Sequence, residues 1–377
     1  MRPRWWDKLI VFLHRHLFSP YGGVTAGDWL RLLRANHFAV DLPYWPRAGL
    51  LTLGSLANSA ERRREDEQFG AAVARTEVKP PLFVLGHWRT GTTHLHNLLA
   101  IDPRFAYPNS YQVCFPHTFL RTEAKAYQTY AAWIPKRRPQ DNVYISLETP
   151  QEDEFALSIM TACSPYLGWM FPDRARRYER YLTFRGVADE EVRRWKEALV
   201  HFLKKLTWKY DRPLLLKSPP HTARVRLLLE LFPGARFVHI HRNPYRVFQS
   251  TAHTYEAVGP VHALQSRERR PQDEGILRRF GLMYDAFFAE RGLIAAGRFH
   301  EIGFEELEKD PIGRMRQAYE ALGLPDFGGV EGALRRYLDS LTGYRKNELP
   351  DPPTALRRRI DREWRRYFEE FGYPTGG

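Results

Sequence analysis

The sequence KPPLFVLGHWRTGTTHLHNLL, residues 79–99, decides the fold class of this chain. Four apolar residues, Leu82 to Leu85, follow a pair of prolines and predict a strand that is buried on both faces of a parallel sheet. From Gly91 onward, apolar residues return at intervals of three and four, as they do along a helix. Between strand and helix lies the loop GHWRTGTT, residues 86–93. This arrangement predicts an anion site, because backbone N–H groups and the positive end of the helix converge there.

The loop resembles the P-loop of nucleotide-binding proteins except at one position. A P-loop has Lys directly after its second glycine, followed by Ser or Thr. Here Thr92 stands in the lysine position, and the fixed cation of the loop is Arg89. Three threonine hydroxyls and this guanidinium suit phosphate-like oxygens, but the layout of an ATP-hydrolysing site is missing. A tight turn with incidental glycines stays open as the alternative.

Length and charge narrow the class of protein. With 377 residues, the chain is long enough for one large α/β domain or two smaller ones. Its net charge of +13 implies an anionic partner, whether nucleotide, acidic substrate, lipid or nucleic acid. The aromatic content of 14% suggests an apolar acceptor pocket or interface. Two cysteines, without a CxxC pair or a His cluster at ligand spacing, favour a reducing compartment and indicate no zinc site.

The first 78 residues predict a helical extension that precedes a domain over residues 79–377. An apolar stripe with basic residues among it predicts an amphipathic N-terminal helix: Trp5, Trp6, Leu9, Phe12 and Leu13. Such a helix either contacts a membrane surface or packs on its own domain, which is the commoner use of an aromatic stripe. The stripe is too short to span a membrane, and no signal-peptide cleavage site follows it. We therefore expect a cytoplasmic protein, with membrane association through this helix as the alternative.

A second phosphate-binding pattern is RFVHIHRNPYRVFQS, residues 236–250. Its strand delivers Arg242 to the carboxyl end, and the helix that follows carries Ser250. In an open α/β sheet, ligands bind outside the carboxyl ends of the strands, so we expect Arg242 and Arg89 to face one crevice. Further strands over residues 214–217 and 298–304 alternate with helices. This alternation predicts an α/β fold with a doubly wound parallel sheet.

Together these motifs resemble the sulfotransferases that use 3′-phosphoadenosine 5′-phosphosulfate (PAPS) as sulfuryl donor. The resemblance covers about residues 80–350 and implies a P-loop-like three-layer sandwich, with a central, mostly parallel sheet flanked by helices. It implies transfer of a sulfuryl group to a hydroxyl or amine on a small molecule, lipid or glycan, without a metal. Arg242 and Ser250 would hold the 3′-phosphate, and the loop GYRKN adds Arg345 and Lys346. The residues implied for the 5′-phosphosulfate are Gly86, His87, Trp88, Arg89, Thr90, Gly91, Thr92 and Thr93.

A third match is LLLKSPPH, residues 214–221. By the resemblance, Lys217 reaches the transferring sulfuryl group or the bridging oxygen. Sulfuryl transfer resembles phosphoryl transfer in its loose in-line transition state, so positioning and charge stabilisation supply most of the rate. Arg89 and Lys217 would stabilise the charge that develops on the leaving phosphate. Many relatives place a His two residues after this Lys, but Pro219 stands there, which leaves the general base open.

The candidates for the general base come from three segments. Glu152 and Glu154, in LETPQEDEFAL, are the first choice, because acidic side chains would otherwise be misplaced beside an anionic donor. His221 is the second and His87 the third. For each of them, helix capping or a structural hydrogen bond remains the alternative.

Two other functions remain open on the sequence. A P-loop kinase would have Lys in place of Thr92 and a strand-end Asp for magnesium, where His239 and His241 stand. A basic protein that binds nucleic acid or an anionic membrane would use an extended arginine face instead of an anion pocket. A requirement for magnesium would favour the kinase. Binding that is lost in moderate salt would favour the basic binding protein. We predict a sulfotransferase that binds no nucleic acid; the acceptor and the oligomeric state do not follow from the sequence.

Overall fold

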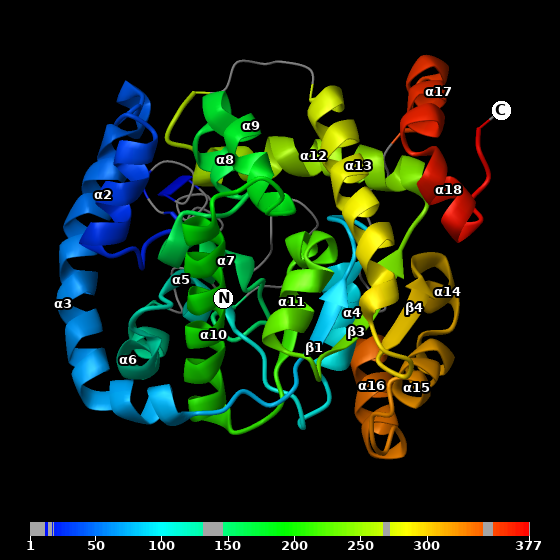
Figure 1. Cartoon of the computed structure of the whole chain (residues 1–377), viewed down its shortest axis with the longest axis horizontal. Coiled ribbons are helices and arrows are strands. Elements are labelled where there is room, and N and C mark those ends of the chain that lie inside the picture. Colours follow the sequence, from blue (N-terminus) through cyan, green and yellow to red (C-terminus); the bar gives the residue numbers. More distant parts are fainter. Residues whose placement is uncertain are drawn as a thin grey trace. The chain divides into compact units, whose positions relative to one another are not determined.

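The computed structural model describes residues 12–13, 17, 19–130, 146–266, 272–341 and 350–376. The chain forms two compact units that alternate along the sequence (Figure 1). Unit 1 comprises residues 1–78, 107–211 and 255–270, and unit 2 comprises residues 79–106, 212–254 and 271–377. Lys79 thus begins unit 2, while a long later segment folds with the first 78 residues. The division into an extension and a domain stays a prediction.

Unit 2 contains a four-stranded sheet whose described strands are all parallel. The strands are β1 (Leu82–Leu85), β2 (Leu215–Lys217), β3 (Arg236–His241) and β4 (Phe299–Gly303). Each lies where the sequence predicts it, in the order β2-β1-β3-β4. Val84 pairs with Lys217 on one side and with Val238 on the other. The carboxyl ends of β2, β1 and β3 are therefore neighbours at one edge of the sheet.

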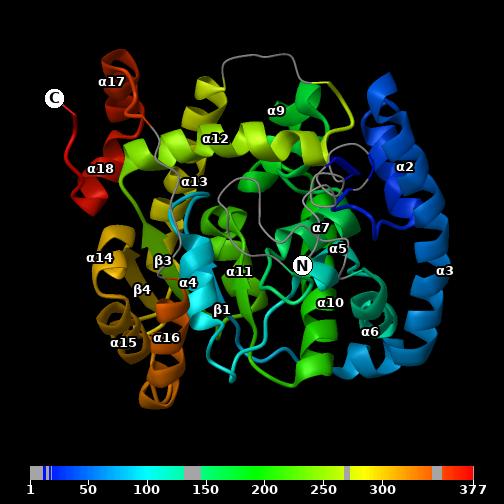
Figure 2. The same ribbon diagram turned by 180° about the vertical axis from the view of Figure 1, so that it is seen from behind.

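Helices cover both faces of this sheet, which makes unit 2 a three-layer α/β sandwich, as predicted. Its helices are α4 (Thr92–Leu99), α11 (Val225–Leu231), α13 (Asp273–Glu290), α14 (Phe304–Lys309), α15 (Pro311–Ala321), α16 (Gly328–Ser340), α17 (Thr354–Glu363), α18 (Arg365–Phe371) and the first part of α12 (Pro244–His262). Successive strand residues point to opposite faces. Leu82 and Val84 join the core formed with α4, α15 and α16. Phe83 lies on the other face, where it stacks on Phe237 with ring centroids 5.5 Å apart, and α11 and α13 cover this face (Figures 1 and 2).

The charged sequence of residues 357–371 predicts a single closing helix, but the segment forms two short helices, α17 and α18. The break is at Trp364, whose indole stacks on Phe280 with ring centroids 3.6 Å apart and donates a hydrogen bond to the carbonyl of Leu277. Tertiary packing of this one side chain redirects the backbone, and the sequence pattern does not reveal it.

Unit 1 is built from helices. They are α2 (Ala26–Ala35), α3 (Trp45–Arg75), α5 (Ser110–Cys114), α6 (Phe119–Tyr130), α7 (Glu154–Thr161), α8 (Leu167–Met170), α9 (Ala175–Tyr178), α10 (Asp189–Tyr210) and the end of α12. Helix α3 is one continuous helix, although its first part is apolar in sequence and its second part is rich in charged residues. The run of charged residues over 61–68 predicts a solvated helix face, and this prediction is wrong at Glu65, which is buried. Glu65 pairs with Lys205, with 2.5 Å between Oε1 and Nζ, and accepts a hydrogen bond from the backbone N–H of Arg121.

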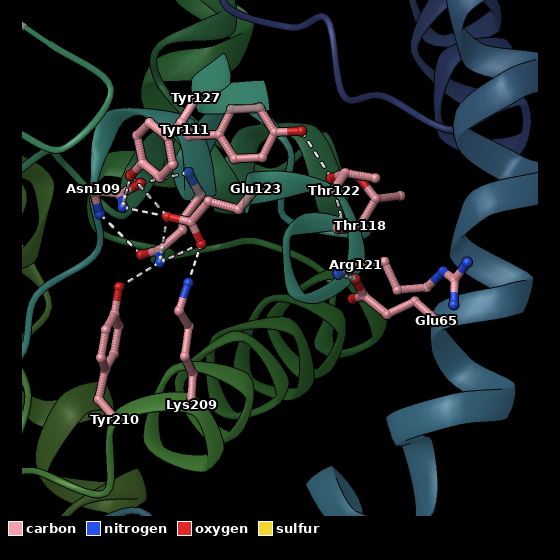
Figure 3. Close-up of polar contacts among 11 residues, drawn as sticks. Glu65, Asn109, Tyr111, Thr118, Arg121, Thr122, Glu123, Tyr127, Lys209 and Tyr210 are labelled. Atoms are coloured by element: carbon pink, nitrogen blue, oxygen red, sulfur yellow. Dashed lines mark hydrogen bonds and ion pairs between the residues drawn. The ribbon is translucent and has the colours of Figure 1, made fainter. Parts of the chain in front are cut away.

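A second buried carboxylate in unit 1, that of Glu123, connects α5, α6 and α10 (Figure 3). Asn109 Nδ2 donates to Glu123 Oε1 at 2.6 Å, and Lys209 Nζ pairs with Glu123 Oε2. Gln112 donates both to this carboxylate and to the hydroxyl of Tyr210. The network satisfies a charge that would otherwise be costly to bury.

Two predictions fall wholly or mostly on residues that the structure does not describe. The N-terminal amphipathic helix lies outside the described residues, apart from Phe12 and Leu13, and so do Arg345 and Lys346. Among the helices that the structure describes, none has the length and apolar character needed to cross a bilayer.

Candidate functional site

The loop after β1 depends on its two glycines. Gly86 has φ of +142°, and a Cβ there would lie 2.6 Å from the carbonyl oxygen of Ile240. Gly91 has φ of +102°, and a Cβ there would lie 2.3 Å from the ring of Phe304. Both the backbone conformation and the space therefore exclude a side chain. Between them, Arg89 has φ of +73°, a rare and strained value for a residue with a side chain.

Arg89 and the strand-end Arg242 meet within unit 2, as the two motifs predict. Arg89 Nε donates to Ser250 Oγ at 2.8 Å, and Arg242 Nη1 donates to the carbonyl oxygen of Arg89 at 3.2 Å. Burial lowers the pKa of Arg242, and the positive charges of Arg89 and Arg246 lower it further. Arginine stays protonated in proteins, so two like charges lie close together here. An anion placed between them would relieve this repulsion.

The backbone of Arg242 is fixed from the C-terminal helix α18. The hydroxyl of Tyr367 accepts a hydrogen bond from the N–H of Arg242 and donates one to its carbonyl, each at 3.0 Å. The guanidinium itself lies 4.2 Å from the ring centroid of Phe304, the residue that also closes over Gly91. The cation is thus oriented by the carbonyl of Arg89 and the ring of Phe304, and the carboxylate of Glu305 lies near it.

Lys217 is buried at the end of β2, next to the start of α4. Its Nζ donates to Thr93 Oγ1 at 3.4 Å. On the same edge, Gly86 N donates to Thr222 Oγ1 at 2.7 Å, which ties the loop to the segment after β2. The first backbone N–H groups of α4 have no acceptor within the helix. Arg89, Lys217, Arg242 and the start of α4 therefore gather at the edge where three strands end.

Two of the candidate bases are buried histidines in unit 2. His87 Nδ1 is 2.8 Å from the carbonyl oxygen of Trp88, and burial lowers the pKa of His87 to about 3. At neutral pH it is an uncharged group that shapes the loop. His221 is also fully buried, with its ring edge-on to Phe83 at 5.5 Å. It packs under β1 in the sheet core.

The two acidic candidates lie at the start of α7, in unit 1. Glu154 is fully buried and accepts a hydrogen bond from Ser164 Oγ at 2.7 Å. Glu152 is half-buried and accepts a hydrogen bond from the hydroxyl of Tyr166. Aromatic rings surround this segment: Tyr166 packs on Phe155 and on Trp169, with ring centroids 5.0 and 4.7 Å apart. Of the two carboxylates, only that of Glu152 retains exposure to solvent.

The family follows from comparison with known proteins. The model of the sulfotransferase family matches residues 80–328, a span that holds the loop, Lys217, Arg242 and Ser250. The chain belongs to the sulfotransferase family. This enzyme is also 38% identical over 353 residues to the omega-hydroxy-beta-dihydromenaquinone-9 sulfotransferases Stf3 of Mycobacterium bovis and Mycobacterium tuberculosis. In each case the match covers 93% of this chain and 90% of the relative.

Solved structures share the fold of this sulfotransferase. Sulfotransferase STF9 from Mycobacterium avium superposes with a TM-score of 0.72 at 20% identity, covering 99% of this chain and 97% of its own. Sulfotransferase STF1 from Mycobacterium tuberculosis gives a TM-score of 0.61 at 16% identity, covering 90% of both chains. The family implies PAPS as the donor. The kinase and nucleic-acid alternatives are thereby set aside.

The loop fits a phosphosulfate donor on its own geometry. Its two glycines leave a cradle that a Cβ would fill, and the guanidinium groups of Arg89 and Arg242 lie beside it. Among the described residues, no three His, Cys, Asp or Glu side chains are grouped to hold a metal ion. The arrangement can hold two anionic groups and stabilise charge on one of them.

Sequence reasoning missed several residues that shape this site. Thr222 bonds the loop from one residue beyond the LLLKSPPH motif, and its hydroxyl in a buried segment was the available signal. Tyr367 bonds Arg242 from a helix far along the chain, and no local sequence pattern predicts this contact. Phe304 begins the segment FEELEKDP, but its packing against Gly91 depends on the register of β4 beside β3.

Proposed function

We propose that this sulfotransferase binds PAPS through the loop of residues 86–93 and through Arg242 and Ser250. The observation that carries the proposal is the hydrogen bond from Arg89 to Ser250, because it joins the two phosphate-binding motifs in one unit. Arg89 would serve the 5′-phosphosulfate, and Arg242 the 3′-phosphate. Guanidinium groups suit both, since they bind phosphate oxygens with two parallel hydrogen bonds. Arg345 and Lys346 stay predicted as further cations for the 3′-phosphate.

When bound, PAPS supplies the sulfuryl group that is transferred to an acceptor hydroxyl. The protein's part is to hold the reacting groups in line and to stabilise charge on the leaving side. Lys217, held by Thr93 at the carboxyl end of β2, and Arg89 would do this. The transfer needs no metal in this scheme.

We propose Glu152 as the general base, with Glu154 and His221 as the alternatives. Glu152 is half-buried, whereas Glu154 and His221 are fully buried. The hydroxyl of Tyr166 holds the carboxylate in one orientation while leaving it able to accept a proton. Glu152→Gln is expected to bind the donor normally and to turn over slowly; full activity of a Glu152→Gln/Glu154→Gln variant would move the role to His221.

For the acceptor, we propose a hydroxyl at the end of an apolar lipid chain. The relatives named as acting on omega-hydroxy-beta-dihydromenaquinone-9 are 38% identical over 93% of this chain, which supports a lipid of this class. The aromatic rings beside Glu152 suit an apolar ligand. Two free cysteines fit a cytoplasmic location, and contact of the N-terminal helix with a membrane stays the alternative to its packing on the domain.

Calorimetric titration with adenosine 3′,5′-bisphosphate tests the donor site directly. We expect binding that is independent of magnesium and tighter than that of ATP. Arg242→Ala should weaken it about 10- to 100-fold, because a charged hydrogen-bonding group is lost. Arg246→Ala is the matched control, since this exposed arginine lies four residues further along the chain, in α12, and pairs with Asp351.

The outcomes separate the alternatives. Tight binding that depends on magnesium and prefers ATP would overturn the proposal. Equal weakening by Arg242→Ala and Arg246→Ala would reduce the site to general electrostatic attraction. Acceptor specificity is then measured as transfer from PAPS to a hydroxylated isoprenoid quinone, with a short water-soluble alcohol as comparison.

A further inference from the structure

The two halves of helix α3 have opposite surface chemistry. From Ala48 to Ala60 the sequence AGLLTLGSLANSA has no charged residue, whereas Glu61 to Arg75 is rich in charges. The one charge in the first half is Arg47, which is fully buried and donates to the carbonyl of Ala263 at 2.7 Å. The outer surface of the first half is therefore uncharged over about four helical turns.

That outer surface is apolar and exposed. Trp45, Leu53 and Leu56 lie on one side of the helix, since they are separated by eight and three residues, and they are 60%, 68% and 60% exposed. Gly49 and Leu50 lie between them on this side and are also exposed. Leu51 and Ser55, on the other side of the helix, are buried against unit 1. We call the exposed side the α3 apolar face.

The apolar face continues onto the segment before α3. Leu42 is 74% exposed and Phe38 is 57% exposed. Trp45 is joined to this segment by a hydrogen bond from its indole N–H to the carbonyl of Val40 at 3.1 Å. In both views α2 lies beside α3, and the remaining helices of unit 1 lie on one side of this pair (Figures 1 and 2). Large apolar side chains gathered in this way mark an interaction surface.

Arginines border the apolar face next to Phe38. Arg177 Nη1 donates to the carbonyl of Ala35 at 2.9 Å, and Arg174 Nη1 donates to the same oxygen at 3.2 Å. Arg34 and Arg176 are exposed in the same neighbourhood, on α2 and α9. These contacts complement the C-terminal end of α2 and place positive charge next to Phe38, at one end of the apolar face. We call these four residues the basic rim.

We propose that the α3 apolar face and the basic rim dock this enzyme on a bilayer that contains anionic phospholipid. Leucine and tryptophan side chains beside arginines are the composition of surfaces that lie in the headgroup region. A second copy of the chain is the less favourable occupant, because a two-fold contact brings the same positive rim together twice. The inference deepens the proposed function and rests on it, since an enzyme that sulfates a lipid has to work at the bilayer.

Vesicle flotation tests the surface without any need for activity. The full-length enzyme is mixed with vesicles of phosphatidylcholine, with or without phosphatidylglycerol. We expect it to float with the anionic vesicles. Leu53→Glu/Leu56→Glu should weaken this binding at least about tenfold. The two leucines that enter the bilayer would become two negative charges, which an anionic membrane repels. Arg34→Ala/Arg176→Ala should weaken binding to the anionic vesicles by about fivefold for each arginine. It should leave any binding to vesicles of phosphatidylcholine unchanged.

The matched control adds the same charge at the same spacing on the same helix. Ala71 and Ala74 are exposed, lie three residues apart as Leu53 and Leu56 do, and belong to the charged half of α3. Ala71→Glu/Ala74→Glu should float like the unmodified enzyme. Equal loss in both double variants would overturn the proposal, because it would reflect net charge instead of a docking face.

Two further measurements separate this proposal from the others. Size-exclusion chromatography identifies a second copy: a dimer that Leu53→Glu/Leu56→Glu dissociates, and that never floats, would overturn membrane docking. Titration of the same variant with adenosine 3′,5′-bisphosphate should give the affinity of the unmodified enzyme. If the unmodified enzyme does not bind the bisphosphate, the proposed donor site is overturned. Flotation would still test whether the α3 apolar face docks on vesicles, because it does not depend on the donor.

Discussion

Lys205 in unit 1 and the arginine pair of the loop in unit 2 are cations with different partners. In unit 1, the ammonium of Lys205 lies 2.5 Å from the carboxylate of Glu65. In unit 2, Arg89 donates to the hydroxyl of Ser250, and Arg242 donates to a backbone carbonyl. A carboxylate cancels the charge of its partner, whereas a neutral oxygen only orients it. The Glu65–Lys205 pair therefore holds helices of unit 1 together, whereas the proposed function gives the two arginines of unit 2 an anionic ligand.

The comparison teaches how to tell a structural cation from a binding one. A buried ion pair costs much of what it gains, and removing one partner is strongly destabilising. A cation that is oriented by hydroxyls at the carboxyl edge of a sheet contributes little to stability and much to binding. Replacing a structural cation or its partner should lower stability and leave activity unchanged. Replacing a binding cation should lower activity and leave stability unchanged, so both are measured on the same variants.

The largest effect is expected for Arg89→Ala. Transfer of the sulfuryl group should fall about 10³-fold, because the loop loses the cation that stabilises developing charge. The unfolding midpoint should stay close to that of the unmodified enzyme. Radiolabelled transfer from PAPS and thermal denaturation measure both, with the exposed Arg63→Ala as the control. Unchanged turnover in Arg89→Ala would remove the loop from the mechanism.

The opposite pattern is expected for Glu65→Gln. The variant keeps an acceptor for the N–H of Arg121 but leaves Lys205 charged in the interior, which should lower the free energy of unfolding by about 3 kcal/mol. Turnover per folded molecule should not change. Replacing both partners, as Glu65→Gln/Lys205→Met, should restore most of the loss. Urea denaturation checks this, and a stable Glu65→Gln protein would contradict the role of the pair.

The smallest effect concerns the dependence of stability on pH, through a buried histidine of unit 1. Burial lowers the pKa of His262, in unit 1, to about 3, against about 6.5 in an unfolded chain. Between these values the unfolded state binds more protons, so stability falls as the pH falls below 6.5. This one residue should account for about 2 kcal/mol between pH 7 and pH 5. Burial of His87 in unit 2 acts in the same direction, so a substitution is needed to isolate the part of His262.

His262→Phe is the variant that isolates this effect. Its ring already stacks on Phe155, and its Nδ1 has no hydrogen-bond partner among the described residues. We expect a shallower loss of stability between pH 7 and pH 5, measured by urea denaturation at several pH values. A slope identical to that of the unmodified enzyme would show that the group does not stay neutral in the folded state.

The sequence predicted unit 2 well because its signals are local. A buried strand, a loop bounded by Gly86 and Gly91 and a helix start are adjacent in the chain, and the four strands follow from short apolar runs. The meeting of Arg89 with Arg242 and Ser250 could be predicted as well, because parallel strands end at one edge. The roles of these residues and of Lys217 stay predictions.

Unit 1 was harder to predict because its decisive contacts join distant segments. Nothing near Glu65 in the sequence indicates that Lys205 lies opposite it. Glu152 stands out as an acidic residue in a basic chain, but its hydrogen bond from Tyr166 depends on the turn between α7 and α8. Residues that act through packing, such as Tyr367, are visible only in three dimensions.

Tyr367 has a consequence for the way the enzyme is made. Its hydroxyl holds both the N–H and the carbonyl of Arg242, although 125 positions separate the two residues. During synthesis, the loop after β1 and the strand that carries Arg242 leave the ribosome long before α18 does. The clamp on Arg242 is therefore completed only when almost the whole chain has emerged, and a nascent chain carries its donor site unfinished until then.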